Sequence, residues 1–215
     1  MLKWALWTPQ PTMLVTGSNH TNDQKIVSTR LMLSGHDFIM ARAALDEVAE
    51  AREISVCIDS AKTVLVPAAL YSTDMNEGYM AVNDKPVDDD ESVVAASCGD
   101  VVALMAVDSR IATLLANLEE CKVSYTSPLL EGVVNYTRAV RITLTAENTY
   151  VVVSDKGKLL YAEVFATTEP DNLMFVMSKL NDVLSLKGYE VRVQGDAAPM
   201  IVESLSELFT DCKTM

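Results

Sequence analysis

The 215-residue sequence predicts a mixed α/β protein made of two lobes. Three observations predict this fold class. Apolar residues make up 49% of the chain, which is enough for a sizeable buried core. The C-terminal half alternates short β-branched runs with two segments of helical periodicity. The N-terminal half uses the same kinds of element, although no letter-level repeat connects the halves, so a duplication is inferred from the pattern alone.

The chain divides into three parts by composition. Residues 1–24 are polar and rich in turn-forming residues, which predicts an arm that is poorly ordered or docked on the body. Residues 25–137 predict an N-terminal lobe. From residue 138 the alternation of apolar and polar side chains becomes more regular, and residues 138–215 predict a C-terminal lobe.

The elements of the N-terminal lobe follow from β-branched alternation, Ala- and Glu-rich stretches and turn residues. They are, in order, a strand over 26–33, a turn at Ser34-Gly35-His36-Asp37, a return strand over 38–43, a helix over 44–52, strands over 53–59 and 62–66, helical pieces over 68–71 and 76–81, strands over 92–97 and 100–107, a helix with Asp108 as its N-cap, a strand over 122–126 and a helix capped by Ser127. The acidic run Asp88–Glu91 predicts a solvated loop, because burying unpaired carboxylates is costly.

The C-terminal lobe is predicted with fewer alternatives. Its elements are strands over 139–147, 150–154 and 159–167, a helix over 169–187 stopped by Gly188, a strand over 189–194 and a helix over 200–210. Three strands joined by tight turns form an antiparallel meander, and a fourth strand reached through a helix lies parallel to its neighbour. This is the ribonuclease-H-like arrangement. A duplicated pair of such lobes is the actin-like ATPase architecture.

The overall charge restricts the partners. The net charge is −13 and no basic run occurs, which argues against nucleic acid and against an anionic membrane surface. The longest unbroken apolar stretches, such as Val101–Val107, are too short to insert in a membrane. The apolar start of the chain is too short for a signal peptide, so we expect a cytoplasmic protein. Four widely spaced cysteines are then expected to be reduced thiols, namely Cys57, Cys98, Cys121 and Cys212.

Several short motifs in a fixed order carry a family resemblance. They are Val66-Pro67 with Leu70-Tyr71, Tyr125 with Ser127–Leu130, Asp155–Tyr161 with Phe165, and Gln194-Gly195-Asp196. With them the sequence resembles a family of uncharacterised bacterial proteins, mostly from Bacteroidetes, grouped as a domain of unknown function. The resemblance covers most of the chain from about residue 26 and implies an actin-like ATPase fold similar to pilus-assembly and secretion-platform proteins. It implies no established activity.

The loops that hold phosphates in actin-like ATPases are poorly matched. Backbone amides must approach the phosphates, which requires glycines. The turn at residues 145–149 has no glycine and contains Glu147, which would repel phosphate. Residues 166–169 read Ala-Thr-Thr-Glu where a glycine pair is expected. If a nucleotide binds, the candidate residues are Gly35, Asp37, Gly195 and Asp196; a single glycine in a hairpin is usually only turn chemistry. We therefore predict no cofactor.

No other catalytic or metal-binding constellation is legible. A Ser-His-acid triad would need His20 or His36, and no Gly-x-Ser-x-Gly turn exists. A metal-dependent nuclease would need several carboxylates on central strands, whereas Asp59 and Asp108 are better explained as caps. The cysteines lack the spacing of a zinc site. No catalytic residue and no metal ligand is predicted.

Two functions from different classes remain in competition. The first is a non-catalytic actin-like scaffold or protein-interaction module with eroded nucleotide-binding loops, whose partner is another protein or a second copy of the chain. The alternative is an ATP-binding actin-like switch or kinase-like enzyme with atypical phosphate loops. A metal-dependent nuclease is a third, weaker hypothesis. The intact pattern of elements beside the altered loops favours a protein that is not an enzyme.

Overall fold

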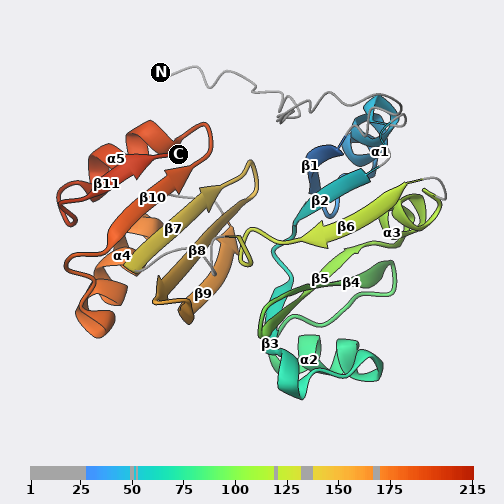
Figure 1. The fold of residues 1–215 in the computed structure, drawn as a ribbon, viewed down its shortest axis with the longest axis horizontal. Coiled ribbons are helices and arrows are strands. Elements are labelled where there is room, and N and C mark those ends of the chain that lie inside the picture. Colours follow the sequence, from blue (N-terminus) through green and yellow to red (C-terminus); the bar gives the residue numbers. More distant parts are fainter. Residues whose placement is uncertain (1–27, 49–50, 52, 119–120, 132–137, 167–169) are drawn as a thin grey trace, which may run out of the picture.

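The structure is a computed structural model that describes residues 28–48, 51, 53–118, 121–131, 138–166 and 170–215. Figure 1 shows two lobes, with strands β1–β6 in the N-terminal lobe and β7–β11 in the C-terminal lobe. The predicted arm at residues 1–24 lies outside the described residues. In the described part of the chain, no helix combines the length and the hydropathy needed to cross a membrane.

The N-terminal lobe contains two three-stranded sheets. Its elements are β1 (Ser28–Ser34), α1 (Phe38–Glu47), β2 (Glu53–Asp59), β3 (Thr63–Pro67), the 3₁₀ turns η1 (Ala68–Leu70) and η2 (Thr73–Met75), α2 (Asn76–Val82), β4 (Glu91–Cys98), β5 (Val101–Asp108), α3 (Ser109–Ala116) and β6 (Lys122–Thr126). Strands β1, β2 and β6 form a parallel sheet in the order β1-β2-β6. Strands β3, β5 and β4 form an antiparallel sheet with β5 in the centre.

The predicted return strand over 38–43 is wrong, because these residues begin helix α1. Asp37 caps the helix, and its carboxylate accepts a hydrogen bond from the Met40 amide at 3.0 Å. Ala41, Ala44 and Leu45 are buried at helical spacing. A helix is also what the topology needs, since β1 and β2 are parallel and parallel neighbours require a crossover connection.

The C-terminal lobe has the predicted strand order. Its elements are β7 (Arg138–Leu144), β8 (Asn148–Asp155), β9 (Lys158–Ala166), α4 (Pro170–Leu184), β10 (Glu190–Gln194), α5 (Ala198–Leu205) and β11 (Cys212–Thr214). The sheet order is β11-β10-β7-β8-β9, with an antiparallel meander from β7 to β9 and β10 parallel to β7. This confirms the ribonuclease-H-like arrangement for this lobe. The N-terminal sheets have a different order within the described residues, so the duplication stays a prediction.

Several elements also differ from the sequence prediction in their bounds or in their presence. Helix α4 ends at Leu184, because Ser185 takes a left-handed conformation (φ 52°), and Gly188 lies in the turn that follows. The residues after Ser127 form a turn over 128–131 rather than the start of a helix, and residues 132–137 lie outside the described part. Strand β11 was not predicted, because three residues without alternation give no periodic signal.

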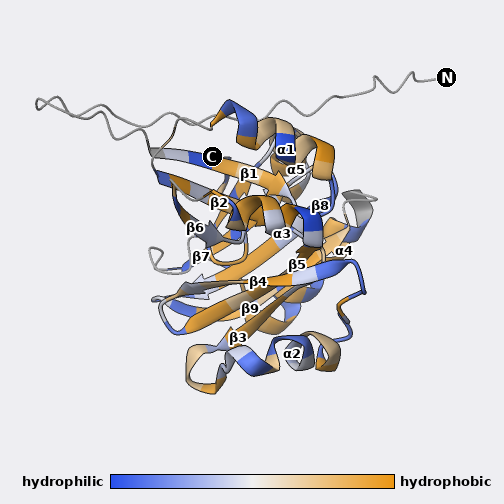
Figure 2. Ribbon diagram, turned by 90° about the vertical axis from the view of Figure 1, so that its right-hand side faces the viewer, coloured by the Kyte–Doolittle hydropathy of each residue, from blue (hydrophilic) through white to orange (hydrophobic). Residues whose placement is uncertain are grey.

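The lobes meet on the helix-free face of the five-stranded sheet. Helices α4 and α5 cover the opposite face, where Val151 and Val153 of β8 join the larger apolar core. Tyr150 and Val152 point the other way and pack with Leu129 and with Leu65 of β3. Strand β8 is therefore buried on both faces. In Figure 2 the strands are mostly apolar, whereas the helices carry both polar and apolar residues.

Candidate functional site

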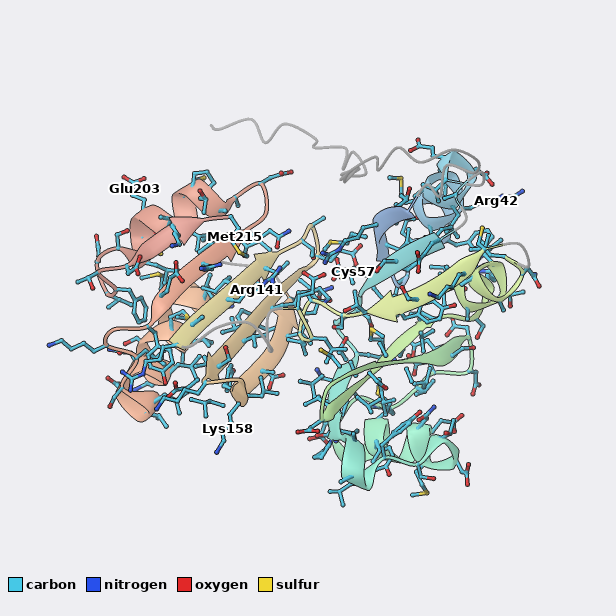
Figure 3. All side chains as sticks on the ribbon, viewed as in Figure 1. Arg42, Cys57, Arg141, Lys158, Glu203 and Met215 are labelled. Atoms are coloured by element: carbon cyan, nitrogen blue, oxygen red, sulfur yellow. The ribbon has the colours of Figure 1, made fainter. Side chains whose placement is uncertain are left out.

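Polar side chains from both lobes converge where the lobes meet. We call this set the lobe junction and define it as Arg30 of β1, Asp59 and Ser60 at the end of β2, Glu131 after β6, Arg141 of β7, Asn148 and Tyr150 of β8, and Gln194 of β10. Strand alternation accounts for the position of Asp59. This residue is adjacent in sequence to the core residue Ile58, so its side chain points away from the core. Figure 3 places Arg141 and Cys57 on the facing sides of the two lobes.

The carboxylate of Asp59 is bound by side chains of the other lobe. The side-chain amide of Asn148 donates a hydrogen bond through Nδ2 to Asp59 Oδ1 at 2.7 Å, and the Tyr150 hydroxyl donates to the same oxygen at 2.6 Å. The Ser60 amide donates to the Tyr150 hydroxyl oxygen at 2.7 Å. All four residues are buried. The prediction that Asp59 is a cap is therefore wrong, whereas Asp108 does cap α3 by accepting from the Arg110 amide.

Tyr150 remains protonated in this environment. Burial, and next the negative charge of Asp59, raise the pKa of the Tyr150 hydroxyl far above its ordinary range. The hydroxyl is therefore a hydrogen-bond donor to Asp59 and no base for catalysis. A buried network whose donors and acceptors are paired holds its members in one geometry.

A buried carboxylate between two arginines forms the second half of the junction. Glu131 pairs through Oε1 with Arg30 of the N-terminal lobe and through Oε2 with Arg141 of the C-terminal lobe, the latter at 2.8 Å. Arg141 also donates to Gln194 Oε1 at 2.8 Å. The side chains of Glu131 and Arg141 are only 8% and 14% exposed. Two cations compensate one desolvated carboxylate, which ties three strands and the inter-lobe connection together.

Cys57 lies beside these charges and is chemically quiet. Its side chain is fully buried on β2, and burial raises the pKa of its thiol to about 12. Since the thiolate is the reactive form, Cys57 is an inert thiol at neutral pH. All four cysteines of the chain are free thiols, as predicted.

The structure gives Gly35 and Asp37 structural roles. A Cβ on Gly35 would lie 3.1 Å from the Asp59 carbonyl oxygen and 3.3 Å from Ser60 Cβ, so the close approach of β1 to the junction needs a glycine. The Gly35 amide donates to that same carbonyl at 2.7 Å. Asp37 is the N-cap of α1 and points its carboxylate at Met40.

Gly195 packs against Leu144 at the end of β7 and follows the junction residue Gln194 in sequence, whereas Asp196 is exposed. Gly195 has a φ of 121°, and a Cβ there would lie 2.4 Å from the Leu144 carbonyl oxygen at the end of β7. Asp196 is exposed in the turn before α5. Both predicted glycines thus border the lobe junction, and the two aspartates lie beside them without joining its hydrogen bonds.

Two backbone amides of the turn between β7 and β8 are committed to hydrogen bonds within the turn. The Thr145 amide donates to the Asn148 carbonyl at 2.9 Å, and the Asn148 amide donates to Thr145 Oγ1 at 2.9 Å. Glu147 is exposed in the same turn. An anion would find there two committed donors and one like charge. The other loop predicted to be altered, after β9, includes residues 167–169, which lie outside the described part of the chain.

One further arrangement has the order of a catalytic triad, which the sequence analysis did not anticipate. Ser60 Oγ lies 3.5 Å from His36 Nε2, and His36 Nδ1 lies 3.7 Å from Glu91 Oε1. Ser60 is fully buried, however, and its hydroxyl donates to the Ala106 carbonyl at 2.7 Å. Glu91 is shared with Lys62, whose ammonium lies 2.7 Å from Oε2. A nucleophile needs access to substrate and a hydroxyl proton that its base can remove, so this set is structural.

Among the residues that the structure describes, no three His, Cys, Asp or Glu side chains come together as a set of metal ligands. Sequence reasoning did not predict the junction, and it missed Arg30, Arg141, Asn148 and Tyr150 as well as Glu131. The signal for Glu131 is weak: a glutamate directly after the buried pair Leu129-Leu130, which predicts a carboxylate drawn into an apolar environment.

Comparison with known proteins identifies the fold and a family. The family described as "Protein of unknown function (DUF3822)" matches residues 39–198. A crystal structure from Bacteroides thetaiotaomicron, described as a protein with actin-like ATPase fold and unknown function, is similar with a TM-score of 0.64 and 14% identity, covering 80% of this chain and 75% of that one. No curated protein matches the sequence.

Two components of bacterial assemblies are more distant. The PilM–PilN type IV pilus biogenesis complex has a TM-score of 0.42 at 14% identity, with 92% of this chain and 83% of the other covered. The cytoplasmic domain of EpsL, an inner membrane component of the type II secretion system of Vibrio cholerae, has a TM-score of 0.39 at 13% identity, with 80% and 69% covered. Scores this low support no inference about this chain.

Proposed function

This chain belongs to the DUF3822 family of proteins of unknown function and has an actin-like ATPase fold, and on that premise we propose that it is a non-catalytic scaffold that binds another protein. The observation that carries the proposal is the lobe junction. In place of small residues and free amides it has a tyrosine and an asparagine that both donate hydrogen bonds to a buried aspartate. Such a junction favours rigid lobes over a site that opens for a ligand.

The β7–β8 turn supports the same conclusion. The backbone amides of Thr145 and Asn148 are committed within the turn, and Glu147 adds a negative charge. Displacing the Asn148 and Tyr150 contacts to admit phosphates would leave the buried Asp59 carboxylate unpaired, which is costly. A nucleotide would need to offset that cost before it could bind.

Isothermal titration with ATP and Mg²⁺ tests the proposal. We expect no heat of binding at millimolar nucleotide and no release of phosphate over hours. Binding in the micromolar range would contradict the scaffold. The Tyr150→Phe variant is titrated in parallel. This variant lacks the hydroxyl that occupies the junction, so it tests whether that hydroxyl is what prevents a nucleotide from binding.

The alternative is an ATP-binding switch or kinase-like enzyme with atypical phosphate loops. The fold favours it, because the solved protein of TM-score 0.64 is described as having an actin-like ATPase fold. The nucleotide would then be held near Gly35, Asp37, Gly195 and Asp196. This function requires micromolar binding that Asp37→Asn or Asp196→Asn weakens, and those two substitutions leave the junction contacts in place.

We infer the class of partner from the net charge and the cellular compartment from the free thiols. A net charge of −13 disfavours nucleic acid and anionic membranes, which leaves a protein or a second copy of the chain. Four free thiols fit a reducing cytoplasm. Size-exclusion chromatography with light scattering distinguishes a monomer from a homo-oligomer.

A further inference from the structure

Apolar side chains lie exposed on helix α2 and on the two 3₁₀ turns before it. The helix is attached to the β3-β5-β4 sheet by Met80, which is fully buried. Another face of the helix holds three residues spaced by four and by three positions, namely Met75, Tyr79 and Val82. Met75 is 53% exposed and Val82 is 78% exposed. We call Leu70, Met75, Tyr79 and Val82 the α2 stripe.

The α2 stripe is held in a defined shape. The Tyr79 hydroxyl donates to the Leu70 carbonyl oxygen at 2.5 Å and accepts from the Ser72 amide at 3.2 Å, which brings the exposed Leu70 beside the helix. A Cβ on Gly78 would lie only 3.4 Å from Met75 Cε, so the methionine side chain lies along the helix at that point. The exposed apolar groups are therefore presented on an ordered surface rather than on separate loops.

Unpaired carboxylates surround the stripe in sequence. Residues 70–91 contain seven carboxylates and one lysine. Lys62 pairs with two of them, Asp88 and Glu91. The single lysine of the segment, Lys85, donates to the Thr63 carbonyl and pairs with Glu163 of β9. Asp90 lies near α3, where its charge acts on Arg110 and its carbonyl accepts from the Ser109 amide. Four other exposed carboxylates have no ion pair within the described residues, and these are Asp74, Glu77, Asp84 and Asp89.

We propose that the α2 stripe and the four unpaired carboxylates Asp74, Glu77, Asp84 and Asp89 form a docking surface for a basic amphipathic segment of another protein. Apolar side chains of the segment would cover Met75 and Val82, and its lysines or arginines would pair with the acidic rim. Charge selects this occupant. A second copy would place acidic rim against acidic rim, and nucleic acid or an anionic membrane would meet the same repulsion.

The other lobe offers a matched control surface. Val183 on α4 is 78% exposed, as Val82 is. Its neighbourhood differs, because the Lys179 ammonium lies 5.7 Å from the centre of the Phe175 ring and brings a positive charge to that face. The substitutions Val82→Glu and Val183→Glu therefore change the same residue at the same exposure on two different surfaces.

The probe is a synthetic amphipathic helix of leucine, lysine and arginine, roughly 18 residues or about five turns long. Two companion peptides are a scrambled sequence of the same composition and a version with glutamate at every basic position. Binding to the full chain is measured by fluorescence anisotropy. Chemical-shift mapping on the ¹⁵N-labelled protein locates the bound peptide.

We expect the basic amphipathic peptide to bind, with its shift changes centred on residues 70–91. The variant Val82→Glu should weaken binding by about tenfold or more, and Val183→Glu should change it by less than about twofold. Added salt should weaken binding, and the glutamate peptide should not bind. Circular dichroism should show both variants folded, because both valines are exposed.

Four results would overturn the proposal: no binding of the basic peptide, equal binding of the scrambled peptide, equal loss in the two valine variants, or a stable dimer that Val82→Glu dissociates. The last would make a second copy the occupant. The inference depends on the proposed function only in taking the partner to be a protein. Nucleotide binding with an intact peptide response would refute the scaffold and leave the docking surface standing.

Discussion

The hydroxyl of Tyr150 occupies the centre of the contact between the lobes. It donates to the Asp59 carboxylate and accepts from the Ser60 amide, and all three groups are buried. Replacing Tyr150 by phenylalanine removes one oxygen and leaves a buried carboxylate with one partner fewer and a buried amide unpaired. We expect the free energy of unfolding to fall by about 2 kcal/mol, measured by urea denaturation.

Tyr161 provides the control for this substitution. It is half-buried on β9, and its hydroxyl makes no hydrogen bond within the described residues. Tyr161→Phe should change the free energy of unfolding by less than about 0.5 kcal/mol. Equal effects of the two substitutions would mean that the junction hydrogen bonds contribute nothing beyond the loss of a phenol oxygen.

At the scale of elements, Gly195 allows β10 to leave the sheet beside the end of β7. A Cβ at this position would lie 2.4 Å from the Leu144 carbonyl oxygen, and φ is 121°. Gly195→Ala therefore combines backbone strain with a steric clash, and we expect a loss of about 3 kcal/mol in the free energy of unfolding. Thermal and urea unfolding measure it.

Gly99 serves to distinguish backbone strain from the steric clash. It also has a positive φ, 57°, but a Cβ there would meet nothing within 4 Å. Gly99→Ala should cost about 1 kcal/mol, the expense of the left-handed conformation alone. If both variants lost the same stability, the clash with Leu144 would not be real, and the tight packing of β10 against β7 would need another explanation.

At the scale of the whole molecule, Glu131 is one of the residues that connect the two lobes. This carboxylate pairs with Arg30 in one lobe and Arg141 in the other. Glu131→Gln keeps the shape but removes the charge, which leaves two arginines less compensated at a mostly buried site. We expect the free energy of unfolding to fall by about 2 kcal/mol. This is less than the effect of breaking a fully buried ion pair, because Arg30 is half-exposed. Hydrogen exchange should increase first in β7 and β10.

An exposed ion pair gives the comparison. Lys122 and Glu53 pair at 3.0 Å, with side chains that are 79% and 41% exposed. Glu53→Gln should change stability by less than about 0.5 kcal/mol and leave exchange at the junction unaltered. Faster exchange spread evenly over both lobes of Glu131→Gln would indicate general destabilisation rather than a loosened junction.

Local periodicity and turn chemistry were enough to predict part of the fold. The alternation over 138–166 and the tight turns between its strands predicted the meander, and the helical spacing after residue 169 predicted the crossover to β10. The Asp108 cap and the strand over 53–59 are likewise local. These signals act within a few residues, where neighbouring side chains alone set the backbone preference.

The connection between β1 and β2 and the meeting of distant polar groups depend on packing between segments that are far apart in the sequence. The segment after Asp37 has β-branched and aromatic residues compatible with a strand, and it became a helix because β1 and β2 are parallel and need a crossover. Asp59 and Tyr150 are separated by 91 positions, and nothing near either one in sequence indicates the other. Burial of a carboxylate depends on distant partners, so packing settles it after local structure has formed.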